Sequence, residues 1–405
     1  MTARLRSGEF WVRVALALYA AYLGWLFLRW ALRHDQVDFG VYRAGGAALL
    51  HGRDLYKLRV PPVYLPFTYP PAAAALFVAF SAVSVRTGQF LWAAVAIVGL
   101  WFFVRLTLRR YAAGFASTSV LVTLVLFIFV ARSNPLRLGM QLGQINVVIG
   151  LLIVADLCGV LPRVPRGCMI GVAAALKLTP AFLVAYFLAV RRFREAANVT
   201  ATFVAISVAA FVVAPHASRN YWLDGYFADA RRTGRISYIS NQSLNGVLIR
   251  VVHSSVHAKP WWLLAAVAVA AFVLVCVRRI EPDRPWLAEA LAMATMLLVS
   301  PVSWIHHWIL VLPFLVAGTR LCLEAAGRAR FVLFAAIGLL SVLLYEGVAF
   351  KVPHNYNLEY HHTVVQFFVG NADVFVLLGV VAGGAILALR QPSALRNLAA
   401  SGAAT

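Results

Sequence analysis

The sequence has 405 residues, of which 62% are hydrophobic and only 13% are charged, and its mean hydropathy is +0.80. A water-soluble fold cannot hide so large an apolar fraction, so the composition excludes a soluble protein and indicates an integral membrane protein. The net charge is +21, but the Lys and Arg residues are scattered between apolar stretches, which argues against nucleic acid and favours anionic lipid or phosphate as a partner.

Hydropathy predicts an all-α polytopic membrane protein whose residues 1–405 form a single transmembrane domain. We expect about ten full spans and an uncleaved first span, with a short re-entrant or interfacial helix at residues 70–84. Residues 168–190 are broken by Lys177 and Pro180, which predicts two half-length spans. The ten full-length runs lie at residues 10–31, 89–107, 114–131, 145–161, 197–214, 261–279, 286–302, 306–319, 331–350 and 372–390.

The distribution of basic residues predicts the orientation of these spans. If residues 70–84 do not cross and both half-length spans do, the dense basic clusters all fall on one side, which the positive-inside rule makes cytoplasmic. Both termini are then cytoplasmic in a multi-pass protein of the inner (plasma) membrane, and all ten histidines lie on the outer side. The outer loops are residues 33–69, 132–144, 216–259 and 351–371. The basic clusters are Arg4/Arg6/Arg13, Arg105/Arg109/Arg110, Arg163/Arg166, Arg191/Arg192/Arg194, Arg278/Arg279, Arg328/Arg330 and Arg390/Arg396.

Two aspartates follow the first span. A carboxylate at this place can meet a lipid-borne substrate while it faces a wet cavity, as a general base for a sugar hydroxyl must. Either aspartate could instead cap a helix that begins near Val41. We favour the capping role for Asp35 and the functional role for Asp38.

Polar residues at the outer membrane edge form a second group of candidates. An ammonium between two half-length spans costs roughly 2.5 to 3.5 kcal/mol on insertion scales, so Lys177 should face a partner such as phosphate unless it snorkels to the surface. Gln144 and Asn146 present amides that either contact a sugar or bond a neighbouring helix. Tyr69 precedes two prolines, which structure alone could explain.

An amide-rich turn follows a basic stretch in the second long outer loop. Asn241 and Gln242 suit the recognition of hydroxyl groups, and Arg231, Arg232 and Arg235 suit phosphate. A solvated loop would explain the same residues equally well.

Two adjacent histidines occupy a short outer connection. His306 and His307 are flanked by Trp304 and Trp308, which offer stacking surfaces for a sugar ring or prenyl chain, although an interfacial aromatic belt is the alternative. The pair lacks a nearby carboxylate, and the four cysteines show no CxxC spacing, so no metal or disulfide site is indicated. We expect no cofactor, and a metal requirement and the oligomeric state stay open.

Taken in order, six blocks of this chain resemble glycosyltransferase family 87, the membrane-embedded polyprenyl-phosphomannose-dependent α-(1→2)-mannosyltransferases of mycobacteria and their relatives. The similarity runs from about residue 10 to about residue 320. The blocks are VDFGVYRAGG at 37–46 with GRDLY at 52–56, LPFTYPP at 65–71, GQIN at 143–146, LKLTP at 176–180, NQSLNG at 241–246 and SWIHHW at 303–308.

The resemblance implies a C-type glycosyltransferase (GT-C) fold with its active site on the extracytoplasmic face. By motif position, Asp38 is the catalytic base and His306 and His307 belong to the catalytic site. The other residues that the resemblance assigns to substrate binding are Lys177, Gln144, Asn146, Asn241, Gln242, Tyr69, Arg43, Tyr42 and Trp304.

The implied reaction is the inverting transfer of mannose from polyprenyl-phosphate-mannose to a glycolipid acceptor. The acceptor is a phosphatidylinositol mannoside, lipomannan or lipoarabinomannan. Transfer of another polyprenyl-phosphate sugar, such as arabinofuranose, is the nearest alternative. A glycolipid transporter is a further alternative, but it predicts charged residues deep in several spans, where Asp156 is one of few candidates.

Overall fold

The computed structural model describes residues 2–113 and 119–390, with side chains from residue 9 onward. This part of the chain is built from 19 α-helices and seven short 3-10 helices, and it contains no strand beyond two isolated bridges. The prediction of an all-α membrane protein is therefore confirmed. Arg396, one member of the basic clusters, lies outside the described residues.

The helices of the first half of the chain are α1 (Thr2–Arg33), α2 (Val37–Leu50), η1 (Leu55–Lys57), α3 (Pro71–Leu76), α4 (Val78–Ser81), α5 (Val85–Tyr111), α6 (Val120–Arg132), α7 (Asn134–Leu142), α8 (Asn146–Cys158), α9 (Cys168–Leu176), η2 (Thr179–Ala181), α10 (Phe182–Ala189) and α11 (Phe193–Val213). Those of the second half are α12 (Pro215–Trp222), η3 (Tyr226–Ala228), η4 (Ala230–Thr233), α13 (Leu244–Val252), α14 (Ser255–Ile280), α15 (Pro285–Val299), η5 (Ile305–Val311), α16 (Leu312–Glu324), α17 (Gly327–Glu346), η6 (Val348–Lys351), η7 (Leu358–His361), α18 (Val364–Gly370) and α19 (Ala372–Arg390).

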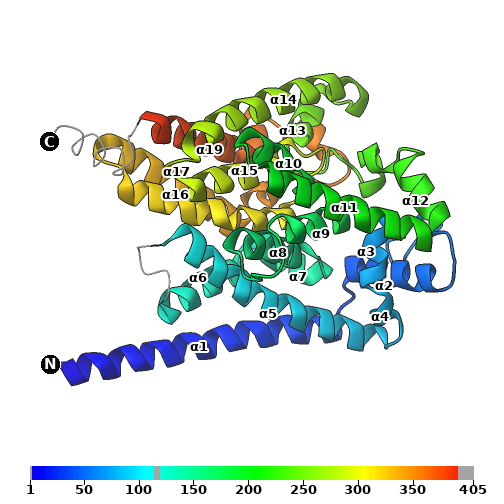
Figure 1. Ribbon diagram of the computed structural model, residues 1–405, viewed down its shortest axis with the longest axis horizontal. Helices are drawn as coiled ribbons and strands as arrows, with labels where there is room; N and C mark the ends of the chain where they lie inside the picture. The colour runs from blue at the N-terminus through cyan, green and yellow to red at the C-terminus, as the bar shows by residue number, and fades with distance from the viewer. Residues whose placement is uncertain (1, 114–118, 391–405) are drawn as a thin grey trace.

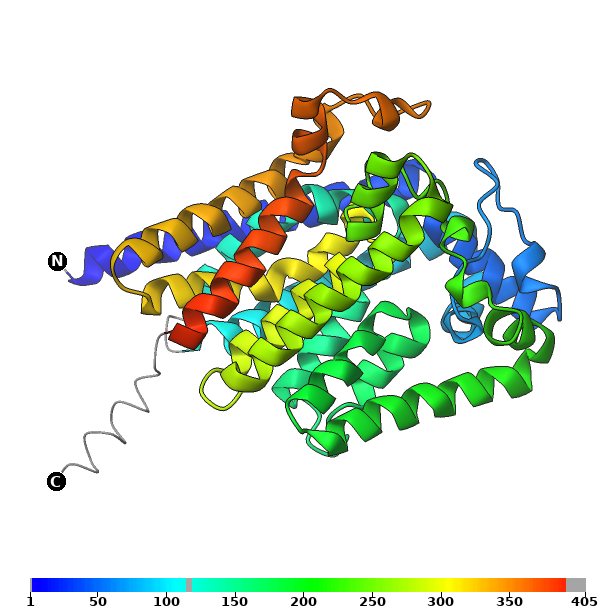
Figure 2. The same ribbon diagram turned by 90° about the horizontal axis from the view of Figure 1, so that it is seen from above.

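The long helices run along the longest axis of the molecule. In both views the start of α1, the turn between α16 and α17 and the end of α19 lie toward one end (Figure 1, Figure 2). The short helices α2, α3, α4 and α12 gather at the opposite end. The two chain termini therefore lie toward one end of the molecule. The opposite end is built from the segments that the sequence predicts to be outer loops.

Seven helices among the described residues are long and apolar enough to cross a membrane, or eight if the bent pair α6 and α7 is one span. Hydropathy alone indicates about ten. Two of the expected runs are shorter as helices because α8 ends at Gly159, whose φ is 63°, and α15 ends before Pro301. Their 13 and 15 residues are fewer than the roughly 20 that a full span needs.

Two breaks shape the end of the molecule where the short helices gather. The predicted break at Lys177 is present, since α9 stops at Leu176 and Lys177 is extended with φ −151° and ψ 122°. The expected single helix before Ser84 is instead divided at Phe77 into α3 and α4. Helix α2 packs against this division so closely that a Cβ on Gly46 would lie 2.5 Å from the backbone of Phe77.

A buried carboxylate fixes the start of α9. Asp156 in α8 accepts backbone hydrogen bonds from Gly167 at 2.7 Å, Met169 at 2.8 Å and Ile170 at 3.2 Å. These donors belong to the first turn of α9, whose N–H groups have no partner within the helix. Asp156 thus has a structural role, which argues against the alternative in which it belongs to the path of a transporter.

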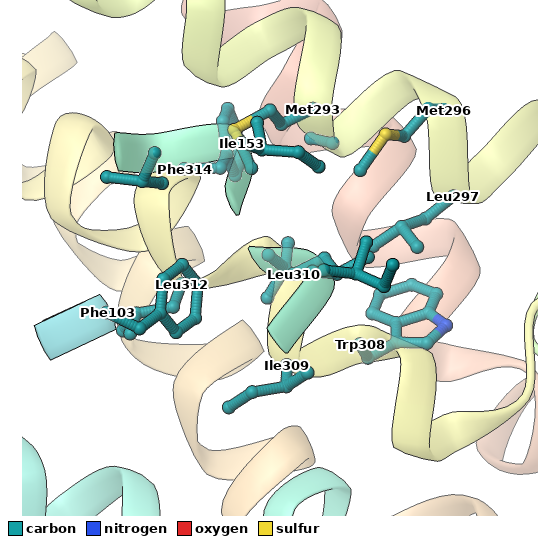
Figure 3. Packing of buried hydrophobic residues seen from close by; sticks show 14 of the residues in the cluster. Phe103, Ile153, Met293, Met296, Leu297, Trp308, Ile309, Leu310, Leu312 and Phe314 are labelled. Carbon is teal, nitrogen blue, oxygen red and sulfur yellow. The ribbon is translucent and has the colours of Figure 1, made fainter. Parts of the chain in front are cut away.

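The apolar core supports the short helix that carries the histidine pair. Figure 3 shows Phe103 of α5, Ile153 of α8, Met293 of α15 and Leu310 of η5 in one apolar cluster. Helix α8 approaches this cluster through Gly150, where a Cβ would lie 2.9 Å from Phe103 and 3.0 Å from Leu310. Close packing of this kind holds η5 in one position, and the histidine pair with it.

Candidate active site

A cavity of about 710 Å³ is lined in part by residues of α2 and α12. These are two of the short helices at the end opposite the termini (Figure 1). Its lining comes from five parts of the chain that are far apart in sequence. These are the start of α2, residues 59–70, residues 177–182, residues 221–234 and residues 296–307, and Gln144 also lines the cavity. The cavity is large enough for a sugar ring and part of a lipid headgroup.

Asp38 lies in the first turn of α2 and faces this cavity. The helix begins at Val37 after an extended Gln36, so Asp38 is not the residue that caps it. Its Oδ2 accepts a hydrogen bond from Gln144 Nε2 at 2.7 Å, while Oδ1 accepts none from the described residues. Burial raises the pKa of Asp38 to about 6, although the Gln144 hydrogen bond and the charge of Lys177 oppose that rise.

Asp35 differs from Asp38 in every respect that bears on catalysis. Its side chain is 62% exposed, it forms an ion pair with Arg86 at 3.1 Å, and it does not line the cavity. It is not the capping residue of α2 either, because Gln36 occupies that position. The preference for Asp38 as the functional aspartate therefore has a structural basis.

Two tyrosines hold the amide of Gln144 in the orientation that serves Asp38. Gln144 Oε1 accepts a hydrogen bond from Tyr42 at 3.1 Å and lies 3.5 Å from the hydroxyl of Tyr69. The Tyr42 hydroxyl also lies 2.7 Å from the Tyr69 hydroxyl. Because the oxygen of Gln144 is occupied by hydroxyl donors, its nitrogen is turned toward the carboxylate. Tyr69 lines the cavity, and Tyr42 lies behind it.

Lys177 projects into the cavity from the break between α9 and η2. Its ammonium donates to Asn146 Oδ1 at 2.7 Å and to His307 Nε2 at 2.8 Å, and it lies 5.8 Å from the centroid of the Tyr69 ring. Asn146 does not line the cavity, but its amide nitrogen donates to the carbonyl of His306 at 3.0 Å. Asn146 therefore links the positions of Lys177 and the histidine pair. When it is protonated, Lys177 places a positive charge in the cavity that Asp38 also lines.

The two histidines have different environments although they are adjacent. Their rings meet edge to face with centroids 4.7 Å apart. His307 is engaged with Lys177, whereas both ring nitrogens of His306 are buried and have no hydrogen-bond partner among the described residues. A buried polar group without a partner is costly, so His306 is equipped to bind a group that enters the cavity.

The amide-rich turn supports the cavity from behind rather than lining it. Asn241 Oδ1 accepts hydrogen bonds from the Ser303 backbone and the Ser243 hydroxyl, both at 2.9 Å, and Asn241 forms an isolated bridge with Trp304. Gln242 donates its amide to backbone carbonyls at Ile239 and Gly370. Both amides are fully buried. They position Trp304, which does line the cavity.

Arg43 is also absent from the cavity wall. Its guanidinium donates to the carbonyls of Phe80 at 3.1 Å and Val83 at 2.8 Å, at the end of α4. Of the predicted site residues, seven line the cavity, and Tyr42 and Asn146 form hydrogen bonds with residues that line it. Arg43, Asn241 and Gln242 form structural hydrogen bonds instead.

The sequence did not single out an aromatic and apolar wall of this cavity. Tyr221, Tyr226, Phe182 and Met296 all belong to this wall. The only signal for the tyrosines was the density of aromatic residues in the second outer loop, which is not specific. Among the described residues, no group of three His, Cys, Asp or Glu side chains is arranged to hold a metal ion.

Comparison with known proteins identifies the family. The profile of glycosyltransferase family 87 matches residues 67–301, which is more than half of the chain. The chain belongs to glycosyltransferase family 87. It is a glycosyltransferase, and the resemblance inferred from its motifs is confirmed. The match includes Tyr69, Gln144 and Lys177, but it begins after Asp38 and ends before His306.

Relatives of this family 87 protein in mycobacteria are similar over most of its length. A polyprenol-phosphate-mannose-dependent α-(1-2)-phosphatidylinositol mannoside mannosyltransferase of Mycolicibacterium smegmatis is 34% identical over 75% of this chain and 73% of its own. A protein of the same description from Mycobacterium tuberculosis is 33% identical over 82% of this chain and 80% of its own. A phosphatidylinositol pentamannoside mannosyltransferase of Mycobacterium tuberculosis is 33% identical over 69% and 65%. No solved structure matches this family 87 chain.

Proposed function

We propose that this family 87 protein is an inverting α-(1→2)-mannosyltransferase that transfers mannose from polyprenyl-phosphate-mannose to a phosphatidylinositol mannoside or a related lipoglycan. The relatives' descriptions supply the donor and the acceptor. The observation that carries the proposal is the placement of Asp38 in one cavity with Lys177 and the unpartnered His306.

The chemistry requires one base and one stabilised leaving group. The acceptor hydroxyl attacks C1 of the mannose from the face opposite the phosphate, and its proton passes to Asp38 Oδ1. The bond between C1 and the phosphate oxygen breaks, and the electron pair leaves with the polyprenyl phosphate. Attack on a β-linked mannosyl phosphate from the opposite face gives an α-linked product, so a single displacement accounts for inversion.

Several side chains suit this displacement. Gln144 holds one oxygen of Asp38 and leaves the other open to the acceptor. Lys177 provides positive charge where charge develops on the departing phosphate. The apolar side chains of Phe182 and Met296 offer a surface for the prenyl chain. A phosphate leaves as an anion without a strong general acid, so the mechanism needs no proton from Asp229, the other carboxylate of the cavity wall, which is paired with Arg231.

The orientation in the membrane is part of the proposal. We place the protein in the plasma membrane with both termini in the cytoplasm and the cavity on the extracytoplasmic side. The first turns of α17 carry Arg328 and Arg330, and the last turn of α19 carries Arg390, all toward the end opposite the cavity (Figure 2). A positive surface at that end agrees with a cytoplasmic location.

Substitution of the base tests the reaction. Asp38→Asn keeps the size and the Gln144 contact but cannot accept a proton, so transfer of mannose from polyprenyl-phosphate-mannose should fall by about 100-fold to 10,000-fold. Asp35→Asn is the matched control, because Asp35 is a neighbouring, exposed aspartate that does not line the cavity. If purified Asp38→Asn protein keeps the wild-type rate, the proposed mechanism is wrong.

Labelling of single cysteines tests the orientation. In a variant without the four native cysteines, Tyr356→Cys should react with an impermeant thiol reagent in intact cells, because Tyr356 is 94% exposed in an outer segment. Arg328→Cys should react only after the membrane is opened. The reverse pattern would overturn the proposed orientation.

A further inference from the structure

Three arginines precede the amide-rich turn, and the structure separates them. Arg231 forms an ion pair with Asp229 at 2.8 Å. Arg235 forms one with Glu359 at 2.8 Å and has further hydrogen bonds nearby. The guanidinium of Arg232 has neither a carboxylate nor any other hydrogen-bond acceptor among residues 2–113 and 119–390. Arg232 is therefore the member of this basic stretch whose charge is not satisfied by the protein.

The guanidinium of Arg232 is nevertheless held in place. It lies over the ring of Tyr226, 3.9 Å from the centroid, and 5.3 Å from the centroid of Tyr56. Its Nη2 is buried without an acceptor, and the residue lines the same cavity as Asp38. The hydroxyl of Tyr56 donates to the carbonyl of Tyr69 at 2.9 Å, which connects the two stacking rings to the cavity wall. The Arg232 guanidinium is thus an oriented, planar cation that faces the cavity with donors not engaged by the described residues.

We infer that Arg232 is a phosphate-binding residue that contacts a lipid-borne phosphate in the cavity. A buried N–H without an acceptor costs free energy, which a phosphate oxygen of the substrate would recover. A guanidinium that is already oriented by aromatic rings loses little freedom when it forms a two-point contact with phosphate. The inference rests on the proposed function for the identity of the phosphates, which are the monoester left by the prenyl donor and the diester of the phosphatidylinositol acceptor.

Arg232 and Lys177 differ in their remaining capacity to bind a ligand. Lys177 already donates to Asn146 and His307, which leaves it one N–H. Arg232 has all five side-chain N–H groups free of acceptors in the described part of the chain. The stacking alone would explain the position of Arg232, but it does not explain why its buried Nη2 lacks an acceptor.

Equilibrium binding to the purified full-length protein tests the inference. The probes are decaprenyl phosphate, phosphatidylinositol and, as an uncharged reference, decaprenol. Arg232→Gln should weaken the binding of at least one phosphate lipid by roughly ten- to a hundred-fold and leave the Kd of decaprenol unchanged. Arg219→Gln is the matched control, because Arg219 is an exposed residue of α12 that carries one positive charge and does not line the cavity. It should leave all three Kd values unchanged.

The two phosphate probes distinguish the source of the phosphate. Weaker binding of decaprenyl phosphate assigns Arg232 to the donor, and weaker binding of phosphatidylinositol assigns it to the acceptor. Unchanged binding of both, or an equal loss for decaprenol, overturns the inference. If Arg232→Gln does not fold, Tyr226→Leu provides the test, because it removes the ring on which the Arg232 guanidinium stacks. It should weaken binding of the same phosphate lipid and leave binding of decaprenol unchanged. Binding does not require turnover, so Asp38→Asn protein that still transferred mannose would refute the proposed mechanism and leave this result standing.

Discussion

Replacing Gln144 with methionine should shift the pH dependence of the enzyme without removing its base. Gln144 Nε2 donates at 2.7 Å to Asp38 Oδ2 and lowers a pKa that burial raises. Methionine has a similar length and no donor, so the pKa of Asp38 should rise. A hydrogen bond to a charged group contributes about 1.5 to 3 kcal/mol, and 1.36 kcal/mol corresponds to one pKa unit, so the rise is about 1 to 2 units above the value of about 6.

The expected profile follows from the ionised fraction of Asp38. At pH 6 about half of the wild-type carboxylate is ionised, whereas a pKa between about 7 and 8 leaves about 1 to 9% ionised. The value of kcat/KM for Gln144→Met should therefore be about 5- to 50-fold below the wild type at pH 6 and nearly equal to it at pH 9. The assay is transfer of labelled mannose from polyprenyl-phosphate-mannose between pH 5 and pH 9.

The control and the refuting result are both specific. Asp35→Asn should leave the acid limb in place, because Asp35 is exposed and does not line the cavity. If Gln144→Met loses the same fraction of activity at every pH, Gln144 does not set the pKa of the base. If the acid limb does not move at all, Asp38 is not the group whose ionisation it reports.

Further substitutions examine the leaving-group site and the scaffold. Lys177→Met should lower kcat by about 100-fold or more in the same transfer assay, because it removes the charge beside the departing phosphate, and a wild-type kcat would contradict that role. Gly150→Ala should lower the free energy of unfolding by about 1 to 3 kcal/mol through overpacking, whereas Gly338→Ala, which meets no atom within 4 Å, should not, and thermal unfolding would distinguish them. Glu289→Gln should cost about 3 to 5 kcal/mol because it leaves Arg110 without its buried carboxylate, and an unchanged unfolding temperature would show that the pair is dispensable.

The candidate active site was predictable where a polar residue stands in an apolar stretch or in a very short connection. Lys177 stands between two apolar half-helices next to a proline, and His306 and His307 are adjacent in a very short connection. Such residues need partners: Lys177 finds them in Asn146 and His307, whereas the ring of His306 has none among the described residues. Asp38 was predictable from its place just after the first long helix, although its link to Gln144 was not, since the two residues are far apart in sequence.

The sequence was ambiguous where one residue type serves two purposes. Buried amides such as Asn241 and Gln242 can bind sugar hydroxyls or backbone groups, and only the tertiary structure shows that backbone groups occupy them here. The resemblance assigns Arg43 to substrate binding, but its guanidinium donates instead to the carbonyls at the end of α4. Helix lengths were uncertain for a similar reason, because an apolar run does not reveal that Gly159 ends a helix early.

The nine residues of α9 connect two fixed points, the carboxylate of Asp156 at one end and the ammonium of Lys177 at the other. A helix turns by about 100° and advances about 1.5 Å with each residue, so adding or deleting a single residue here would swing the lysine away from Asn146 and His307. The length of α9 therefore sets the position of Lys177 relative to Asp156. Insertions and deletions that a surface loop tolerates should abolish transfer activity when they fall in α9. This helix is therefore unsuited to inserted tags and well suited to a scan for loss of function.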